Sequence, residues 1–71
     1  MLQLSPIEME IVELLEKKKR LSIIDIAREL RRSSSTISKY VSKLNTAGVV
    51  EIDESEPPRK FARLTQRGKK Q

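Results

Sequence analysis

Residues 22–48 read SIIDIARELRRSSSTISKYVSKLNTAG, and this stretch decides the fold. Apolar residues recur at helical spacing on both sides of a short polar break, which predicts two amphipathic helices over about 23–31 and 34–47. Ser22 and Ser33 are favourable caps for the two helix starts, and Gly48 is the expected left-handed residue after the second helix. Two helices joined by a turn of a few residues form a helix-turn-helix unit.

The second of these helices has an unusual solvent face. Ile37, Val41 and Leu44 cluster on one side, while the opposite side holds hydroxyl and lysine side chains. A free helix surface would favour Glu, Lys and Ala, and serines near a helix start are locally costly. Short hydroxyl side chains let the backbone approach DNA closely and bond phosphates or base edges. We therefore favour a DNA-reading face over the alternative, a serine cap followed by an indifferent polar surface.

The composition argues against catalysis and metal binding. The 71 residues make one domain with a thin core and no room for a deep substrate cavity. Cys and His are absent, which removes thiolate nucleophiles, disulfides, thiol sensing and the usual zinc ligands. The two glycines, Gly48 and Gly68, form no phosphate-binding loop. We therefore predict that the chain is not an enzyme and that it holds no cofactor or metal.

The sequence also lacks the patterns of membrane insertion and export. No apolar run approaches the roughly 20 residues of a membrane span, and the acidic N-terminus does not resemble a signal peptide. We expect a cytoplasmic protein with no membrane partner.

Charge is distributed along the chain in blocks. The net charge is +5, with four Glu and no base in residues 1–16 and nine bases against two acids in residues 17–48. Residues 49–58 then carry four acids, and residues 59–71 carry six bases. This alternation suggests one basic face for a polyanion and a back that faces away from it. The run Lys17-Lys18-Lys19-Arg20 fits phosphate contact and equally fits a helix C-terminus, whose dipole favours cations.

A further helix is predicted over about 6–19. Ser5, Pro6 and Glu8 form a capping box with proline at the first helical position. The core stripe of this helix is expected to consist of Ile7, Ile11, Leu14 and Leu15. Met9 and Val12 fall on the opposite side. Together with the N-terminal residues they suggest a dimer contact made by Met1, Leu2, Met9 and Val12.

After Gly48 the periodicity changes to that of strands. Residues 49–53 are β-branched and roughly alternating, residues 54–58 contain consecutive prolines that cannot sit inside a paired strand, and residues 59–64 form a return strand. Leu21 is placed to pair in a short strand before the second helix. Three helices followed by a β-hairpin predict an α+β fold, a winged helix-turn-helix with its wing over about 49–64. The whole chain, residues 1–71, is expected to be this single domain.

The chain resembles the MarR-like group of winged helix-turn-helix transcriptional regulators and its small archaeal relatives. The resemblance runs from about Ser5 to Gly68 and rests on three segments: LSIIDIAREL, SSSTISKYVSKLNTAGVV and RKFARLTQRG. The last segment is similar to the family's wing, with Arg59, Leu64, Thr65 and Gly68 at the matching positions. This resemblance implies that the third helix enters the major groove of double-stranded DNA, with the wing on the flanking minor groove or backbone.

The resemblance also implies, position by position, a set of DNA contacts. Lys39 is the first choice for a base contact, because Lys or Arg to guanine is the commonest specific pairing. Ser33 and Ser34 would bind phosphate near the helix N-terminus, and Arg59, with Lys60, would act in the wing. The expected DNA-contacting residues are Ser33, Ser34, Ser35, Thr36, Ser38, Lys39, Ser42, Lys43, Arg59, Lys60, Arg32 and Arg28. A homodimer on a palindromic site is expected.

Three features depart from the family pattern. Arg31 stands where Gly or another small residue is usual, so we expect the turn to differ in shape. The wing carries three acids within residues 53–56, so either Arg59 acts there alone or the loop tip points away from DNA. The sequence ends at Gln71, where the family continues into a long dimerisation helix, and no small-molecule effector is inferred.

Two alternatives remain open at the level of the sequence. A winged helix that binds proteins in a transcription or replication assembly is favoured slightly by the acidic wing and the acidic first helix. The hydroxyl-and-lysine face argues against it, because interaction faces are normally depleted of Lys. Pro57-Pro58 also resembles the wing of Z-DNA-binding winged helices. Ser38 and Ser42, however, hold the positions where those proteins place a stacking aromatic residue.

Overall fold

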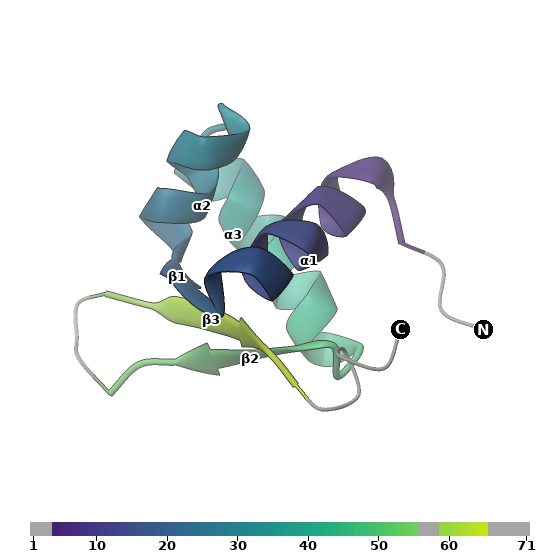
Figure 1. The fold of residues 1–71 in the computed structure, drawn as a ribbon, viewed down its shortest axis with the longest axis vertical. Coiled ribbons are helices and arrows are strands. Elements are labelled where there is room, and N and C mark those ends of the chain that lie inside the picture. The colour runs from purple at the N-terminus through teal and green to yellow at the C-terminus, as the bar shows by residue number, and fades with distance from the viewer. Residues whose placement is uncertain (1–3, 56–58, 66–71) are drawn as a thin grey trace.

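The computed structural model describes residues 4–55 and 59–65 (Figure 1). Three helices and three short strands follow one another in the order α1 (Pro6–Lys18), β1 (Arg20–Ser22), α2 (Ile23–Leu30), α3 (Ser34–Thr46), β2 (Val50–Asp53) and β3 (Phe61–Leu64). In Figure 1 the helices lie above the sheet, and α3 lies behind α1. This arrangement confirms the expected α+β winged helix-turn-helix, with the short strand that was expected around Leu21.

The first helix, α1, begins at the predicted capping box. The Ser5 N–H donates to Glu8 Oε1 at 3.0 Å, and the Glu8 N–H donates to Ser5 Oγ at 3.4 Å. The two bonds satisfy backbone donors at the helix start. The helix ends at Lys18, one residue before the predicted end, because Lys19 has φ 72° and ψ −57° and cannot continue a right-handed helix.

The turn between α2 and α3 contains a residue in the left-handed region. Ser22 Oγ accepts from the Asp25 N–H at 3.1 Å, and Ser33 Oγ accepts from the Thr36 N–H at 3.2 Å, so both serines are helix caps. Arg31 has φ 56° and ψ 45°, a conformation that glycine adopts at little cost. Arg31 thus takes a backbone conformation that glycine adopts more readily, and the expected difference in turn shape stays a prediction.

The chain leaves α3 through Gly48, whose φ of 81° confirms the expected left-handed stop. The Val49 N–H then donates to the Leu44 carbonyl at 3.0 Å, and the Thr65 hydroxyl donates to the Gly48 carbonyl at 2.6 Å. These bonds join the segment before β2 to the end of α3 and to the end of β3. Both α2 and α3 stop one residue earlier than predicted, because the last predicted residue of each helix is its cap.

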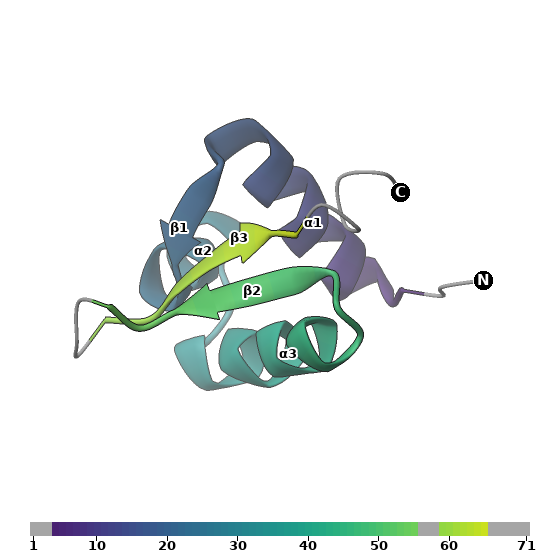
Figure 2. The same ribbon diagram turned by 90° about the horizontal axis from the view of Figure 1, so that it is seen from below.

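The sheet has the strand order β1–β3–β2, and both strand pairs are antiparallel (Figure 2). Leu21 of β1 and Ile52 of β2 lie on either side of Ala62 in the central strand. All three belong to the hydrophobic core or pack against it, so this face of the sheet is turned toward the helices. In Figure 2, α3 lies along one edge of the sheet, and β1 with the end of α1 lies along the other.

The core joins one side of each helix to the inner face of the sheet. Its buried hydrophobic residues are Ile11, Val12, Leu15, Ile26, Ala27, Ile37, Val41, Leu44, Val49, Val50, Ala62 and Leu64. The prediction that places Val12 on the outer side of α1 is wrong, because Val12 is only 8% exposed. Since α1 packs against α2, α3, β1 and β3, its buried stripe is wider than the sequence pattern indicates.

Candidate nucleic-acid interface

The side of α3 away from the core exposes hydroxyl and lysine side chains. Ile37, Val41 and Leu44 are fully buried on the other side of the helix. Tyr40 is half-buried between the two sides, and Lys43 Nζ lies 5.4 Å from the centre of the Tyr40 ring. The exposed residues of this helix that the sequence assigns to DNA are Ser34, Ser35, Ser38, Lys39, Ser42 and Lys43. We call this set of side chains the α3 face.

The N-terminus of α3 holds a small network of hydroxyl groups. Ser33 Oγ lies 3.3 Å from Ser35 Oγ and accepts a hydrogen bond from the Thr36 N–H. It also donates to Thr36 Oγ1 at 2.8 Å. Ser33 and Thr36 therefore have a structural role in capping the helix, and Thr36 is only half-exposed. Their contact with phosphate stays a prediction.

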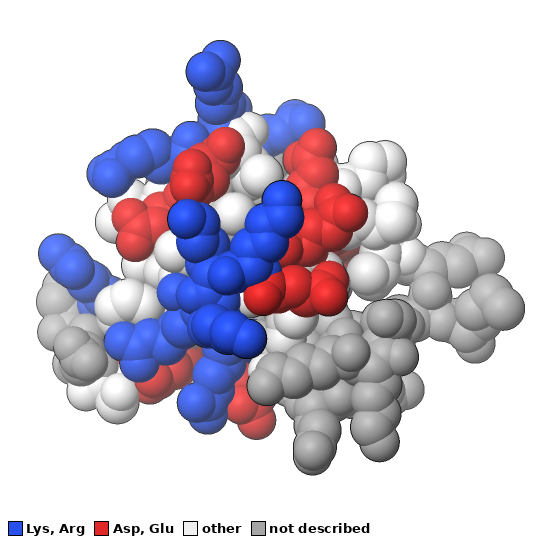
Figure 3. Space-filling model, in the orientation of Figure 1, with Lys and Arg blue, Asp and Glu red and all other residues white. Residues whose placement is uncertain are grey.

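Cations also gather on the face opposite α3. Figure 3 shows the molecule from the side that α1 covers, with α3 behind. Lys and Arg side chains crowd the area where α1 ends above β1 and β3, and acidic side chains lie on either side of them. The blocks of charge along the sequence suggest one basic face and an opposite face that is turned away from a polyanion. The structure places a second dense group of cations on that opposite face.

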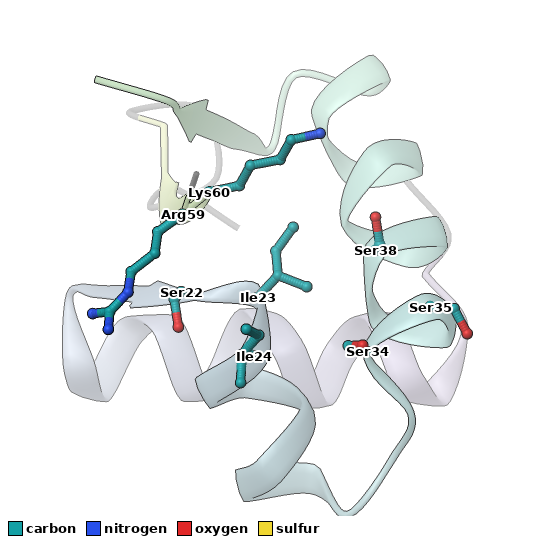
Figure 4. A pocket seen from close by; sticks show the side chains of 8 residues that line it. All are labelled: Ser22, Ile23, Ile24, Ser34, Ser35, Ser38, Arg59 and Lys60. Carbon is teal, nitrogen blue, oxygen red and sulfur yellow. The ribbon is translucent and has the colours of Figure 1, made fainter. Parts of the chain in front are cut away.

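A groove separates α3 from the base of the wing (Figure 4). Its volume is about 550 Å³, and its lining residues are Ser22, Ile23, Ile24, Ser34, Ser35, Ser38, Arg59 and Lys60. In Figure 4 the side chain of Lys60 extends toward α3, that of Arg59 extends along the opposite edge, and Ile23 and Ile24 lie between them and the helix. The groove thus has an apolar floor with hydroxyl groups on one wall and cations on the other.

A backbone hydrogen bond joins the wing side of this groove to its floor. The Ile23 N–H, at the first residue of α2, donates to the Lys60 carbonyl at 3.0 Å. Because Ser22 and Ile23 also lead from β1 directly into α2, the base of the wing is fixed beside the helix-turn-helix unit. Arg59 and Lys60, predicted from the wing pattern, are therefore brought next to Ser34 and Ser38 of α3.

Ile24 is the groove residue that sequence reasoning missed. Its side chain is 58% exposed. At helical spacing Ile24 falls outside the buried side of α2 that Ile26 and Ala27 define, so the signal was present in the sequence. A large apolar side chain left open in a groove rimmed by cations indicates a contact surface rather than core packing.

The two arginines predicted as lesser phosphate contacts lie outside this groove. Arg28 is exposed on α2, with Nη1 3.8 Å from Asp25 Oδ1 one turn earlier. Arg32 is exposed in the turn before α3, and its N–H donates to the Ala27 carbonyl at 2.9 Å. Neither side chain lines the groove, so their contact with DNA stays a prediction.

The acids of the wing strands have cationic neighbours. Asp53 Oδ2 lies 3.4 Å from Arg20 Nη1, and Glu51 Oε2 lies 3.0 Å from Arg63 Nε. Hydrogen bonds from Ser55, whose backbone N–H lies 2.9 Å from Asp53 Oδ1, lower the pKa of Asp53 below 3.8, and Arg20 and Arg63 lower it further. Two of the wing acids are thus tied to the neighbouring strands. Of the other two acids predicted in residues 53–56, Glu54 is exposed, and Glu56 lies outside the described residues.

The two described residues of the predicted dimer set differ in exposure. Met9 is 49% exposed, whereas Val12 belongs to the core. Met1 and Leu2 lie outside the described residues. Within the described segments, the structure leaves Met9 as the exposed member of the predicted set.

Two further findings concern only residues 4–55 and 59–65. No helix in these segments is both long and apolar enough to span a membrane. The same segments hold no group of three or more acidic side chains arranged to bind a metal ion.

Comparison with known folds places this geometry among winged-helix regulators. The structure of reduced AbfR bound to DNA superposes with a TM-score of 0.88 and 21% identity, covering 96% of this chain and 51% of that chain. A MarR family protein from Bacillus stearothermophilus gives a TM-score of 0.86 and 17% identity, covering 97% of this chain and 49% of the other. A putative DNA-binding protein from Ralstonia eutropha gives a TM-score of 0.80 and 22% identity, covering 93% of this chain and 89% of that chain.

The chain therefore spans about half the length of the first two structures. No curated protein sequence matches it significantly. A family model, HVO_A0114, matches residues 3–61, which is most of the chain. The chain belongs to the HVO_A0114 family, and its fold is the winged helix-turn-helix of the MarR-family regulators.

Proposed function

We propose that the protein is a transcription regulator that binds double-stranded DNA in a sequence-specific manner. The α3 face enters the major groove, which is wide enough to admit a helix. Arg59 and Lys60 contact the flanking backbone or minor groove from the base of the wing. The related fold of AbfR, which has been solved bound to DNA, supports this proposal.

One observation carries the proposal: three serines of the α3 face and the two wing cations line the same groove. Ser34, Ser35 and Ser38 are exposed opposite Arg59 and Lys60. Hydroxyl groups and cations are the usual donors to phosphate oxygens, and Lys also pairs with guanine in the major groove. A protein-interaction face would instead be expected to be poor in Lys.

Lys39→Ala tests the base contact. A duplex is first selected from a random pool, and binding is measured by fluorescence anisotropy on this duplex and on a scrambled one. Loss of a base contact costs about 1–3 kcal/mol, so affinity for the selected duplex should fall about tenfold or more, while binding to the scrambled duplex changes less.

Lys39→Arg is the matched variant, because it keeps the positive charge and the ability to pair with guanine. It should retain most of the preference for the selected duplex. Equal losses on both duplexes with Lys39→Ala would remove the base-reading role and leave a phosphate contact. No binding to any duplex at low salt would overturn the proposed function and favour a protein-interaction module.

A further inference from the structure

The face opposite α3 carries a compact group of cations, which we call the rear cluster. Lys17 and Lys18 form the last turn of α1, and Lys19 and Arg20 follow directly. Arg63 of β3 lies opposite Arg20 of β1 in the strand register. All five side chains are exposed. The crowded cations where α1 meets the sheet are visible in Figure 3.

The position of the rear cluster separates it from the α3 face. In Figure 1, α3 lies behind α1, and in Figure 2, α3 and β1 lie along opposite edges of the sheet. The smallest dimension of the molecule is 21 Å. The Debye length is about 8 Å at physiological salt, so cations on one side contribute little to the binding of a duplex on the other.

The fold accounts for the two arginines of the cluster but not for all three lysines. A helix C-terminus carries about half a negative charge, which one or two lysines already offset. Arg20 and Arg63 face each other across two paired strands, and their like charge is offset by Asp53 and Glu51 and, for Arg20, by the Phe61 ring 4.2 Å away. The backbone of Lys19 also has a positive φ, a conformation that costs free energy in a residue other than glycine.

The ion pairs of the region leave the charges of the three lysines available. Asp53 and Glu51 pair with the two arginines on an exposed surface, where such pairs contribute about 1 kcal/mol or less. Within the described segments, no ion pair is formed by Lys17, Lys18 or Lys19. The lysines are therefore free to meet an external anion, and the weak pairs beside them can exchange.

The chemistry of the cluster favours a phosphate backbone over a protein surface. Lys19, Arg20 and Arg63 border a hollow of about 460 Å³ between the end of α1 and the sheet, and its other lining residues are Leu15, Glu16 and Leu64. Lysine is depleted in protein–protein interface cores, whereas Lys and Arg supply the salt-dependent attraction to DNA phosphates. We propose that the rear cluster binds the backbone of a second DNA duplex, so that one molecule joins two duplexes. This inference rests on the proposed function, which assigns the first duplex to the α3 face.

A bridging assay tests this inference on the full chain. One duplex is fixed to beads, a second fluorescent duplex is added with the protein, and retained fluorescence reports bridging. Anisotropy with a single dilute duplex reports binding to the α3 face. The rear variant is Lys17→Gln/Lys18→Gln/Lys19→Asn, with Asn at position 19 because Asn tolerates a positive φ. Its bridging should fall about tenfold or more, with single-duplex affinity within about threefold of the wild type.

The matched variant, Lys39→Gln/Lys43→Gln/Arg59→Gln, removes the same number of positive charges from the α3 face and the wing. Net charge alone would give the two variants equal single-duplex affinities, so a difference between them supports separate surfaces. Lys18→Glu, a single exposed substitution, should reproduce part of the bridging loss. Circular dichroism confirms that each variant is folded.

The outcomes separate this inference from the proposed function. Bridging that is absent in the wild type, or unchanged in the folded rear variant, overturns the inference. If the folded rear variant bridges as the wild type does, the two duplexes are held by the α3 faces of two copies of the protein. Capture of poly-glutamate in place of the second duplex also overturns it and points to an acidic protein. If the α3 variant keeps wild-type affinity for a single duplex, the proposed function fails, and the rear variant still reports on the rear cluster.

Discussion

At the scale of single residues, Ile24 is the large apolar side chain that lies most open to solvent in the described part of the chain. It stands on the floor of the groove, between the wing cations and the serines of α3. On a DNA-binding surface, an apolar side chain in such a place contacts a deoxyribose or a thymine methyl group. Ile24 is therefore expected to contribute to binding rather than to folding.

Ile24→Ser tests this assignment. Because the side chain is 58% exposed, the melting temperature should change little. Affinity for the selected duplex should fall about fivefold, since an apolar contact of about 1 kcal/mol is lost. Ile24→Leu keeps the apolar surface and should bind nearly as the wild type does. Wild-type affinity of Ile24→Ser, measured by anisotropy, would contradict a role for this residue in the groove.

At the scale of elements, the wing strands are held by charges from other parts of the sheet. Asp53 in β2 pairs with Arg20 in β1 and accepts a hydrogen bond from Ser55 at the start of the loop. These interactions favour the ionised carboxylate in the folded state, which lowers the pKa of Asp53 below 3.8. The ionised Asp53 thus stabilises the wing at neutral pH.

The sign of this pKa shift predicts a pH dependence. A carboxyl group with a lowered folded-state pKa stabilises the fold above its unfolded pKa, and this contribution is lost as the pH falls through the folded pKa. Asp53→Asn should therefore be less stable than the wild type at neutral pH, with the difference shrinking below about pH 3.8. Denaturant unfolding of both proteins at several pH values measures this difference in the free energy of unfolding.

Salt provides the control for this experiment. Because the hydrogen bonds from Ser55 are the leading cause of the shift, most of the difference should persist at high salt, which screens the attraction of Arg20. A difference that is independent of pH would show that the carboxylate charge does not stabilise the wing.

The elements were largely predictable from the sequence because their signals are local. The Ser5 and Ser22 caps, the Gly48 stop and the strand alternation after it all depend on neighbours within a few residues. Val12 was misplaced because its burial depends on how many elements pack around α1. The pairing of Asp53 with Arg20 joins residues 33 positions apart, and no local pattern encodes it.

The same distinction applies to the candidate interface. The α3 face follows from helical spacing alone, and the sequence predicted it. The groove requires the Lys60 carbonyl to meet the first residue of α2, which is a tertiary contact. The second basic surface was predictable only in part: the run Lys17–Arg20 is evident in the sequence, whereas Arg63 joins it only through the pairing of β1 with β3.

At the scale of the whole molecule, the proposed reading of DNA depends on how many chains bind one operator. A single α3 face covers only a few base pairs, whereas a symmetric dimer reads two half-sites about 34 Å apart. Met9 is an exposed apolar residue on α1. We propose that two chains associate through this region.

Sedimentation velocity with the selected duplex tests the dimer. Two chains should bind each duplex that holds both half-sites, and Met9→Asp should weaken this complex, because a charge would be buried without a partner. Met9→Leu keeps the apolar surface and should assemble as the wild type does. A protein that sediments as a monomer at micromolar concentration, both free and on DNA, would rule out the dimer.

The strand order of the sheet has a consequence for synthesis. The ribosome releases β1 and β2 before β3, yet β3 is the central strand that both of them pair with. Until residues 61–64 have emerged, α1, α2 and α3 can form, but the sheet lacks its central strand. The nascent chain must therefore keep two unpaired strand edges from joining other chains, and the short length of β1 and β2 limits that hazard. The last described strand to leave the ribosome is the one that completes the domain.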